Sequence, residues 1–146
     1  MVEKEAVFRS LLTDASNEFK RQFVVLTGKG YPDISTREFL YLLSDCTKIP
    51  IHGLLDYDPD GMQIANIYQH GSMSLGHEGP SIICARMGHL GVTAADVTKI
   101  VRARDAEGGL EGLICLSLRD RKKAHALLAR RHAEGVARSD INFKHH

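Results

Sequence analysis

Cysteine, net charge and long apolar runs are all scarce in this sequence, and each shortage excludes a class of protein. The three cysteines, Cys46, Cys84 and Cys115, are odd in number and widely spaced, which favours reduced thiols over a disulfide scaffold or zinc ribbon. Lys and Arg total 19 against 18 Asp and Glu, so bulk charge does not indicate nucleic acid. No apolar run approaches the ~20 residues of a membrane span, so we expect no membrane partner.

The length and the apolar content indicate one compact domain. The chain has 146 residues, of which 43% are hydrophobic, enough for a sizeable core. The last residues show no hydrophobic periodicity. We therefore expect a domain over residues 1–134, beginning with only part of a first strand, and a loose tail over residues 135–146.

Helical and strand patterns alternate along the first half of the chain. This alternation predicts βαβ units, which build a mainly parallel sheet flanked by helices, so the fold class is α/β. A capping box, Ser35-Thr-Arg-Glu38, opens the second predicted helix. The predicted helices are Glu5–Phe19, Ser35–Leu43, Met62–Tyr68, Thr93–Val101 and Leu116–Arg131, and the predicted strands are Phe23–Leu26, Ile51–Leu55 and a strand starting at Ile82–Cys84.

Asp56 and Asp58 form the strongest chemical feature, because they follow a predicted buried strand. Ligands of open α/β sheets bind at the carboxyl ends of the strands. Two carboxylates two residues apart there can face one hard cation such as Mg²⁺. The alternative is a solvated acidic turn, in which Asp60 and Gly61 provide ordinary turn chemistry.

Two other interpretations of the acidic run remain open at this point. Asp56, Asp58 and Asp60 with Gly61 match the opening of a calcium EF-hand loop, but Ile67 stands where its bidentate glutamate belongs. A strand followed by Asp-x-Asp also indicates an aspartyl-phosphate phosphotransferase with Asp56 as nucleophile. Asp60 stands where such enzymes carry Thr or Val.

A glycine-rich turn, Gly28-Lys29-Gly30, follows the strand predicted before it, at the same edge of the sheet. Glycines let a backbone approach a phosphate, and the Lys29 ammonium could meet the phosphate charge. The alternative is a plain tight turn. Glu3, near the N-terminus, could supply a third oxygen ligand or be an exposed acid.

Basic residues cluster on the last predicted helix. A charge run on a helix is usually a solvated face, and the alternative is a surface that contacts phosphates. The cluster consists of Arg119, Arg121, Lys122, Lys123, Arg130 and Arg131.

Together these motifs resemble the Toprim domain found in the topoisomerase VI A subunit, which also occurs in its eukaryotic relative, the meiotic double-strand-break protein. The combination of Gly-Lys-Gly-Tyr-Pro-Asp with Asp-x-Asp-Pro-x-Gly is quite specific, although neither half would be alone. The matching segments are Val2-Glu-Lys-Glu-Ala-Val-Phe8, Val25-Leu-Thr-Gly-Lys-Gly-Tyr-Pro-Asp33, Gly53-Leu-Leu-Asp-Tyr-Asp-Pro-Asp-Gly61 and Ile67-Tyr-Gln-His-Gly-Ser72.

The resemblance implies a Rossmann-like Toprim fold, which we expect to be truncated at both ends. It implies that Glu3, Asp56 and Asp58 hold Mg²⁺ or Mn²⁺, and that Gly28, Lys29 and Gly30 contact DNA. It further implies that the partners of the intact protein are double-stranded DNA, a second copy and a topoisomerase VI B-like subunit. In a eukaryote, the implied location is the nucleus.

The same resemblance implies a DNA-cleaving transesterase whose attacking tyrosine is absent here. Tyr31, Tyr41, Tyr57 and Tyr68 all lie outside the family's tyrosine motif. We therefore expect no catalytic residue in this chain and no DNA cleavage by it alone. The main hypothesis is the metal-binding part of a meiotic DNA-breaking subunit; the alternatives are a non-catalytic DNA- or partner-binding remnant and the phosphotransferase.

Overall fold

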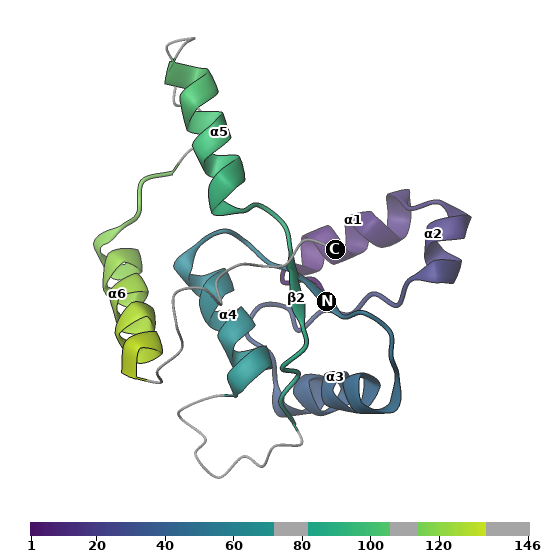
Figure 1. Ribbon diagram of the computed structural model, residues 1–146. Coiled ribbons are helices and arrows are strands. Elements are labelled where there is room, and N and C mark those ends of the chain that lie inside the picture. Colours follow the sequence, from purple (N-terminus) through teal and green to yellow (C-terminus); the bar gives the residue numbers. More distant parts are fainter. Residues whose placement is uncertain (72–81, 106–113, 134–146) are drawn as a thin grey trace.

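The computed structural model describes residues 1–71, 82–105 and 114–133 (Figure 1). The proposed end of the domain at residue 134 and the tail 135–146 lie outside these ranges. No helix within them is long and apolar enough to cross a membrane. The described elements are α1 (Glu5–Asp14), α2 (Asn17–Gln22), α3 (Ile34–Cys46), β1 (His52–Leu54), α4 (Pro59–His70), β2 (Gly88–Leu90), α5 (Ala94–Asp105) and α6 (Leu118–Ala133).

A short parallel sheet lies at the centre of the molecule. β1 and β2 pair in parallel, with His52 opposite Gly88 and Leu54 opposite Leu90. Val2 extends the sheet, because it makes parallel bridges to both Leu54 and Thr27. The order across the sheet is therefore Thr27, Val2, β1 and β2, which confirms the expected α/β class with a parallel sheet.

The order of the segments creates a topological switch point beside Val2. From Val2 the chain moves through α1 and α2 to Thr27 on one side of it, and then through α3 to β1 on the other side. Ligands of open α/β sheets bind outside the carboxyl ends of the strands at such a reversal. The residues that directly follow Val2 and β1 are thus in the position where a site is expected.

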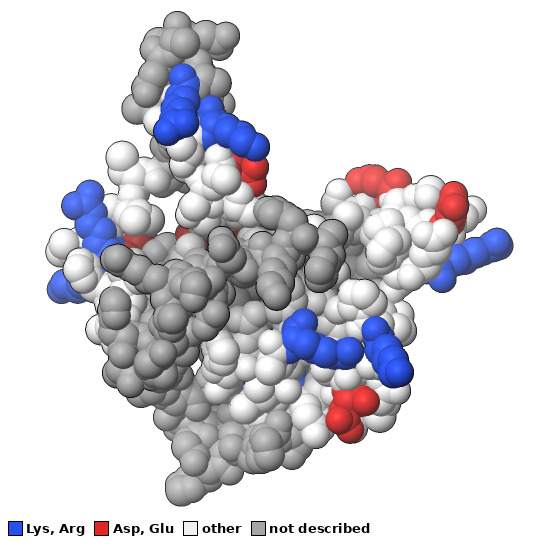
Figure 2. Space-filling view, viewed as in Figure 1, with Lys and Arg blue, Asp and Glu red and all other residues white. Residues whose placement is uncertain are grey.

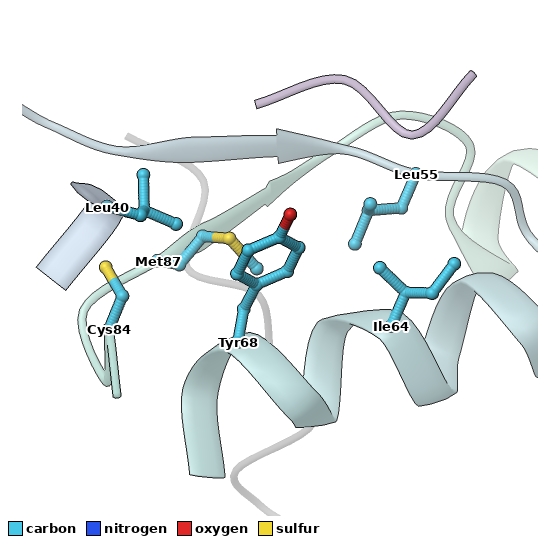
Figure 3. Packing of buried hydrophobic residues seen from close by; sticks show 6 residues of the cluster. All are labelled: Leu40, Leu55, Ile64, Tyr68, Cys84 and Met87. Carbon is cyan, nitrogen blue, oxygen red and sulfur yellow. The ribbon is translucent and has the colours of Figure 1, made fainter. Parts of the chain in front are cut away.

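The core is small and lies between α4, α3 and the strands. Tyr68 and Ile64 rise from α4 toward the sheet, where Ile64 faces Leu55 (Figure 3). Burying apolar side chains of this size stabilises a fold by about 1.5–3 kcal/mol each. The buried cluster consists of Leu40, Leu55, Ile64, Tyr68, Cys84 and Met87, with Met1, Leu26, Ile51 and Ala65 packed against it.

The N-terminal helical region differs from the prediction in two ways. The single helix expected over Glu5–Phe19 is broken, because Ser16 caps a second helix by accepting a hydrogen bond from the Phe19 N–H. The buried strand expected at Phe23–Leu26 is wrong, since Phe23 and Val24 are 55% and 70% exposed. Neither α1 nor α2 buries a residue, and Figure 1 shows both extending away from the central sheet. The α1 and α2 helices therefore contribute no residue to the buried core.

Two further local predictions need correction. Asp33, not the Ser35 box, caps α3, because its carboxylate accepts a hydrogen bond from the Thr36 N–H. The strand expected to start at Ile82 forms later, at β2; Cys84 instead packs into the core and its N–H donates to the Tyr68 carbonyl oxygen. In short strands, one or two hydrogen bonds decide such boundaries, and sequence periodicity does not locate them.

Replacing Tyr68 with phenylalanine is expected to leave stability unchanged or to raise it by up to about 1 kcal/mol. The Tyr68 side chain is 1% exposed, and its hydroxyl has no hydrogen-bond partner among the described residues. A buried hydroxyl without a hydrogen-bond partner loses its hydration on folding and gains no hydrogen bond in exchange. Urea unfolding would measure the change, with Tyr68→Ala, expected to lose about 3–5 kcal/mol, as the contrast. A clear loss of stability in Tyr68→Phe would show that the hydroxyl is paired.

Candidate functional site

Three acidic side chains follow the strands at the switch point. Glu3 follows the bridging residue Val2, Asp56 lies two residues beyond β1, and Asp58 is the N-cap of α4. The sequence therefore predicted correctly that these residues share one edge of the sheet. β1, not a helix, precedes Asp56, which contradicts the calcium EF-hand interpretation.

Glu3 and Asp56 are in direct contact. The Asp56 backbone N–H donates to Glu3 Oε2 over 2.9 Å, and Glu3 is only 8% exposed. Burial is the main cause that raises the pKa of Glu3, the Asp56 N–H opposes it, and the charges of Asp56 and Asp58 add to it. The negative charges of Asp56 and Asp58 thus disfavour the charged form of Glu3, and a divalent cation would relieve this repulsion.

Asp56 and Asp58 each have a partner in the structure. Lys4, next to Glu3, forms an ion pair with Asp56, and this contact raises the pKa of Lys4. The Asp58 carboxylate accepts the Gly61 N–H over 2.7 Å and so caps α4. The Lys4 contact could not be predicted from sequence, because neighbouring residues on a strand end face different directions.

The donor chemistry fits a hard cation, although the geometry is not preassembled. Carboxylate oxygens are the protein ligands that Mg²⁺ takes, usually one or two with several waters. Within residues 1–71, 82–105 and 114–133, no three Asp, Glu, His or Cys side chains lie close enough together to form a metal centre. Metal binding would therefore require Asp56 to exchange Lys4 for the cation.

The Lys29 loop, residues 28–32, lies beside the same acids. The Gly30 N–H donates to the Glu3 carbonyl oxygen over 2.9 Å, so the loop is attached to the first strand segment. Lys29 has a φ of 55° and Gly30 a φ of 103°, a left-handed turn that favours glycine. Lys29 Nζ lies 3.7 Å from the Glu5 carboxylate of α1. The Gly30 bond shows that the loop lies at the predicted edge of the sheet, whereas the contact of the Lys29 ammonium with Glu5 is not predicted from sequence.

A group of residues that the sequence did not bring together joins this edge to α6. We call Tyr31, Asp60, Gln63 and Lys123 the Asp60 cluster. Lys123 forms an ion pair with Asp60, and the Tyr31 hydroxyl donates to Asp60 Oδ1 over 2.7 Å. Lys123 is therefore not part of a fully solvated basic face. Residues 60 and 123 are distant in sequence, so only the packing of α6 against α4 reveals the pair.

Charged side chains on one face of the molecule occur in separate groups of both signs (Figure 2). Among the residues that the structure describes, Lys and Arg side chains are visible at α5 and at the edge formed by α6 as separate groups, with uncharged side chains between them. This distribution agrees with the near-zero net charge. Any contact with a polyanion on this face would therefore be local.

Replacing Asp60 with asparagine is expected to flatten the acid limb of the stability curve. Hydrogen bonds from Lys123 and Tyr31 lower the pKa of Asp60 below its ordinary value of 3.8. The unfolded chain then takes up the Asp60 proton at higher pH than the folded chain. The stabilisation is complete above about pH 4 and is lost as the pH falls through the folded-state pKa.

Urea unfolding at a series of pH values below about pH 5 would measure this effect. Asp45→Asn in α3 is the matched control, because Asp45 is an exposed residue away from the cluster. An acid limb of equal slope in wild type and Asp60→Asn would contradict the ion pair.

The fold and site define a Rossmann-like α/β protein with carboxylates and a glycine-rich cationic loop at the switch point. The family model for the Toprim domain of Spo11 and the topoisomerase 6 A subunit matches residues 1–143. The chain therefore belongs to this family, as the sequence motifs predicted.

Three curated relatives from animals and a plant are similar to almost the whole chain. Meiotic recombination protein W68 of Drosophila melanogaster is 32% identical over 144 residues, which cover 98% of this chain and 41% of that protein. SPO11-1 of Arabidopsis thaliana is 36% identical over 130 residues, covering 89% and 34%. Human SPO11 is 34% identical over 130 residues, covering 89% and 31%. The chain thus spans between about a third and two fifths of the length of these relatives.

Proposed function

We propose that this chain is the metal-binding Toprim portion of a subunit that makes DNA double-strand breaks in meiotic recombination. The observation that carries the proposal is the meeting of Glu3 and Asp56 at the switch point, beside the Lys29 loop. The names of the relatives, which are meiotic recombination proteins, support the biological role.

In this proposal Glu3, Asp56 and Asp58 hold Mg²⁺ or Mn²⁺. The cation would neutralise charge on a DNA phosphodiester and orient it for attack. Lys4 is the internal cation that balances Asp56 without metal, so it moves away when Asp56 binds the ion. Gly28, Lys29 and Gly30 would approach a DNA phosphate, since Gly30 is bonded to the Glu3 carbonyl oxygen at this edge and glycines let a backbone approach a phosphate.

The attacking tyrosine would come from outside these 146 residues. Tyr68 is buried, and the Tyr31 hydroxyl is bonded to Asp60. Tyr57 lies between Asp56 and Asp58 and is exposed, so Tyr57→Phe is the necessary control. We expect the chain alone to form no covalent adduct with duplex DNA; an adduct lost in Tyr57→Phe would overturn this part of the proposal.

The proposed partners are those of an intact family protein. They are double-stranded DNA, a second copy and a topoisomerase VI B-like subunit. The proposed location in a eukaryote is the nucleus, where meiotic recombination acts on chromosomal DNA.

Replacing Asp56 with asparagine is expected to weaken Mn²⁺ binding about tenfold or more, because a hard cation loses a charged oxygen ligand. Electron paramagnetic resonance of free Mn²⁺ would measure the affinity directly. Asp45→Asn removes one negative charge from an exposed position of α3 and is the matched control, expected to bind Mn²⁺ as wild type does. Equal affinity in Asp56→Asn and Asp45→Asn would contradict the metal site.

A second candidate is a non-catalytic DNA- or partner-binding Toprim remnant. The ion pair of Lys4 with Asp56 favours it, because this pair already satisfies the carboxylate without metal. DNA binding that is unchanged by Mn²⁺ and by Asp56→Asn would support this candidate. Turnover of a small phosphomonoester that is lost in Asp56→Asn would instead support the phosphotransferase.

A further inference from the structure

We propose that Asp60 is a positioning residue, which with Tyr31 and Lys123 fixes the position of the Lys29 loop relative to Asp56 and Asp58. Lys29 and the cation held by the carboxylates then contact the same DNA phosphate. This inference rests on the proposed function, because it assigns to Asp60 a role in coupling the metal carboxylates to the phosphate loop. It also excludes Asp60, the third aspartate of the run, from the metal ligands.

The Asp60 cluster brings together three segments that are distant in sequence. Tyr31 belongs to the Lys29 loop, Asp60 and Gln63 to the first turns of α4, and Lys123 to α6. The Tyr31 hydroxyl lies 2.7 Å from Asp60 Oδ1 and 2.9 Å from Gln63 Oε1. Lys123 Nζ donates to Asp60 and, over 3.3 Å, to the Tyr31 hydroxyl. The contact is thus a network that joins all three segments.

Lys123 is held in this position more firmly than an ordinary surface lysine. Its side chain is only 19% exposed, and its ammonium lies 5.8 Å from the centre of the Tyr31 ring, within range of a cation–π contact. Its ammonium forms an ion pair with the Asp60 carboxylate, which also accepts the Tyr31 hydroxyl. Asp60 is therefore balanced by Lys123 within the cluster.

The Lys29 loop is attached both to the first strand segment and to α4. Gly30 is bonded to the backbone of Glu3, and the next residue, Tyr31, is bonded to Asp60. Asp60 in turn lies on α4, whose N-cap is Asp58. The Lys29 N–H also donates to Thr27 Oγ1 and its ammonium lies near Glu5, so the loop is tied to the first strands and to α1 as well. The Tyr31 bond ties the loop to α4, and it therefore sets the position of Lys29 relative to Asp58.

The expected consequence is coupling between Lys29 and the bound cation. When both contact one phosphate, the loss of DNA affinity caused by Lys29→Ala should be larger with Mn²⁺ than without it. We expect a difference of about fivefold in wild type, at the low end of common coupling between two sites. In the Tyr31→Phe and Lys123→Met backgrounds, Lys29→Ala should reduce DNA affinity by the same factor with and without Mn²⁺.

The test uses the 146-residue chain and a fluorescent duplex DNA, with binding measured by anisotropy with and without Mn²⁺. Lys29→Ala is made in wild type, Tyr31→Phe and Lys123→Met. Tyr41→Phe in α3 and Lys122→Met, the exposed neighbour of Lys123, are the matched controls and should keep the coupling. Lys123→Arg retains the charge and should restore most of it.

Two further measurements separate the possible failures. Mn²⁺ affinity without DNA and the free energy of unfolding are measured for each variant. Loss of coupling with both quantities near wild type supports the positioning role. Coupling that persists in Tyr31→Phe and Lys123→Met overturns the positioning role of Asp60 but not the proposed function. The same holds if wild type binds Mn²⁺ through Asp56 and shows no coupling. Loss of coupling only in parallel with lost stability overturns the positioning role too. Mn²⁺ binding that is indifferent to Asp56→Asn overturns the proposed function.

Discussion

Replacing Gly61 with alanine should destabilise the protein by about 3 kcal/mol or more, although alanine is the better helix former. Alanine gains about 1 kcal/mol over glycine inside a helix. However, a Cβ at Gly61 would lie 2.2 Å from the Asp56 carbonyl oxygen and 3.1 Å from two more backbone atoms of Asp56. Backbone cannot rotate away as a side chain can, so relieving the clash must displace the Asp56 segment or α4.

Urea unfolding of Gly61→Ala measures this loss, and Mn²⁺ binding of the folded protein reports on Asp56. Glu38→Ala, on the exposed face of α3, is the control for adding alanine to a helix and should change stability by no more than about 0.5 kcal/mol. Unchanged stability in Gly61→Ala would mean that the turn from Asp56 to α4 has free space. The close approach of α4 to Asp56 would then be wrong.

Asp58 has two roles that two substitutions should separate. Asparagine caps a helix about as well as aspartate, so Asp58→Asn should keep the bond from the Gly61 N–H and change stability little. It should still weaken Mn²⁺ binding about tenfold or more, because the negative charge is lost. Asp58→Ala should show the same metal defect and lose about 1 kcal/mol of stability with the cap.

Asp33 provides the matched control, because it caps α3 as Asp58 caps α4. Asp33→Ala should lose about 1 kcal/mol of stability with no change in Mn²⁺ affinity. If Asp58→Asn binds Mn²⁺ as tightly as wild type, Asp58 acts only as a cap, and the metal set reduces to Glu3 and Asp56.

Much of the fold could be predicted because its signals are local. The apolar run at β1 and the pattern of α4 placed Asp56 and Asp58 between a strand and a helix. Exact boundaries were less predictable. The helix expected from Met62 begins at Pro59, because the Asp58 carboxylate caps it by accepting the Gly61 N–H. The prediction of a buried strand at Phe23–Leu26 was wrong, because Phe23 and Val24 are exposed. An apolar run is buried only where another layer of the fold packs over it.

The site could be predicted where a topological rule applied. Parallel strands bring their carboxyl ends to one edge, so residues after different strands meet there whatever their sequence separation. That rule placed Asp56 and the Lys29 loop at one edge, and the resemblance to the family added Glu3. No comparable rule indicates that Lys4 pairs with Asp56, or that Lys123 of α6 reaches Asp60. Those contacts depend on side-chain directions and on how one helix lies on another.

The sequence by itself determined the family, the α/β class and the acidic edge, because motif residues and strand–helix alternation are properties of short segments. Only the tertiary structure decided which charges neutralise one another. Lys4 balances Asp56, Lys123 balances Asp60, and Glu3 is left buried with a raised pKa. Coulomb energy depends on distance and burial, and both are settled only when distant segments pack together.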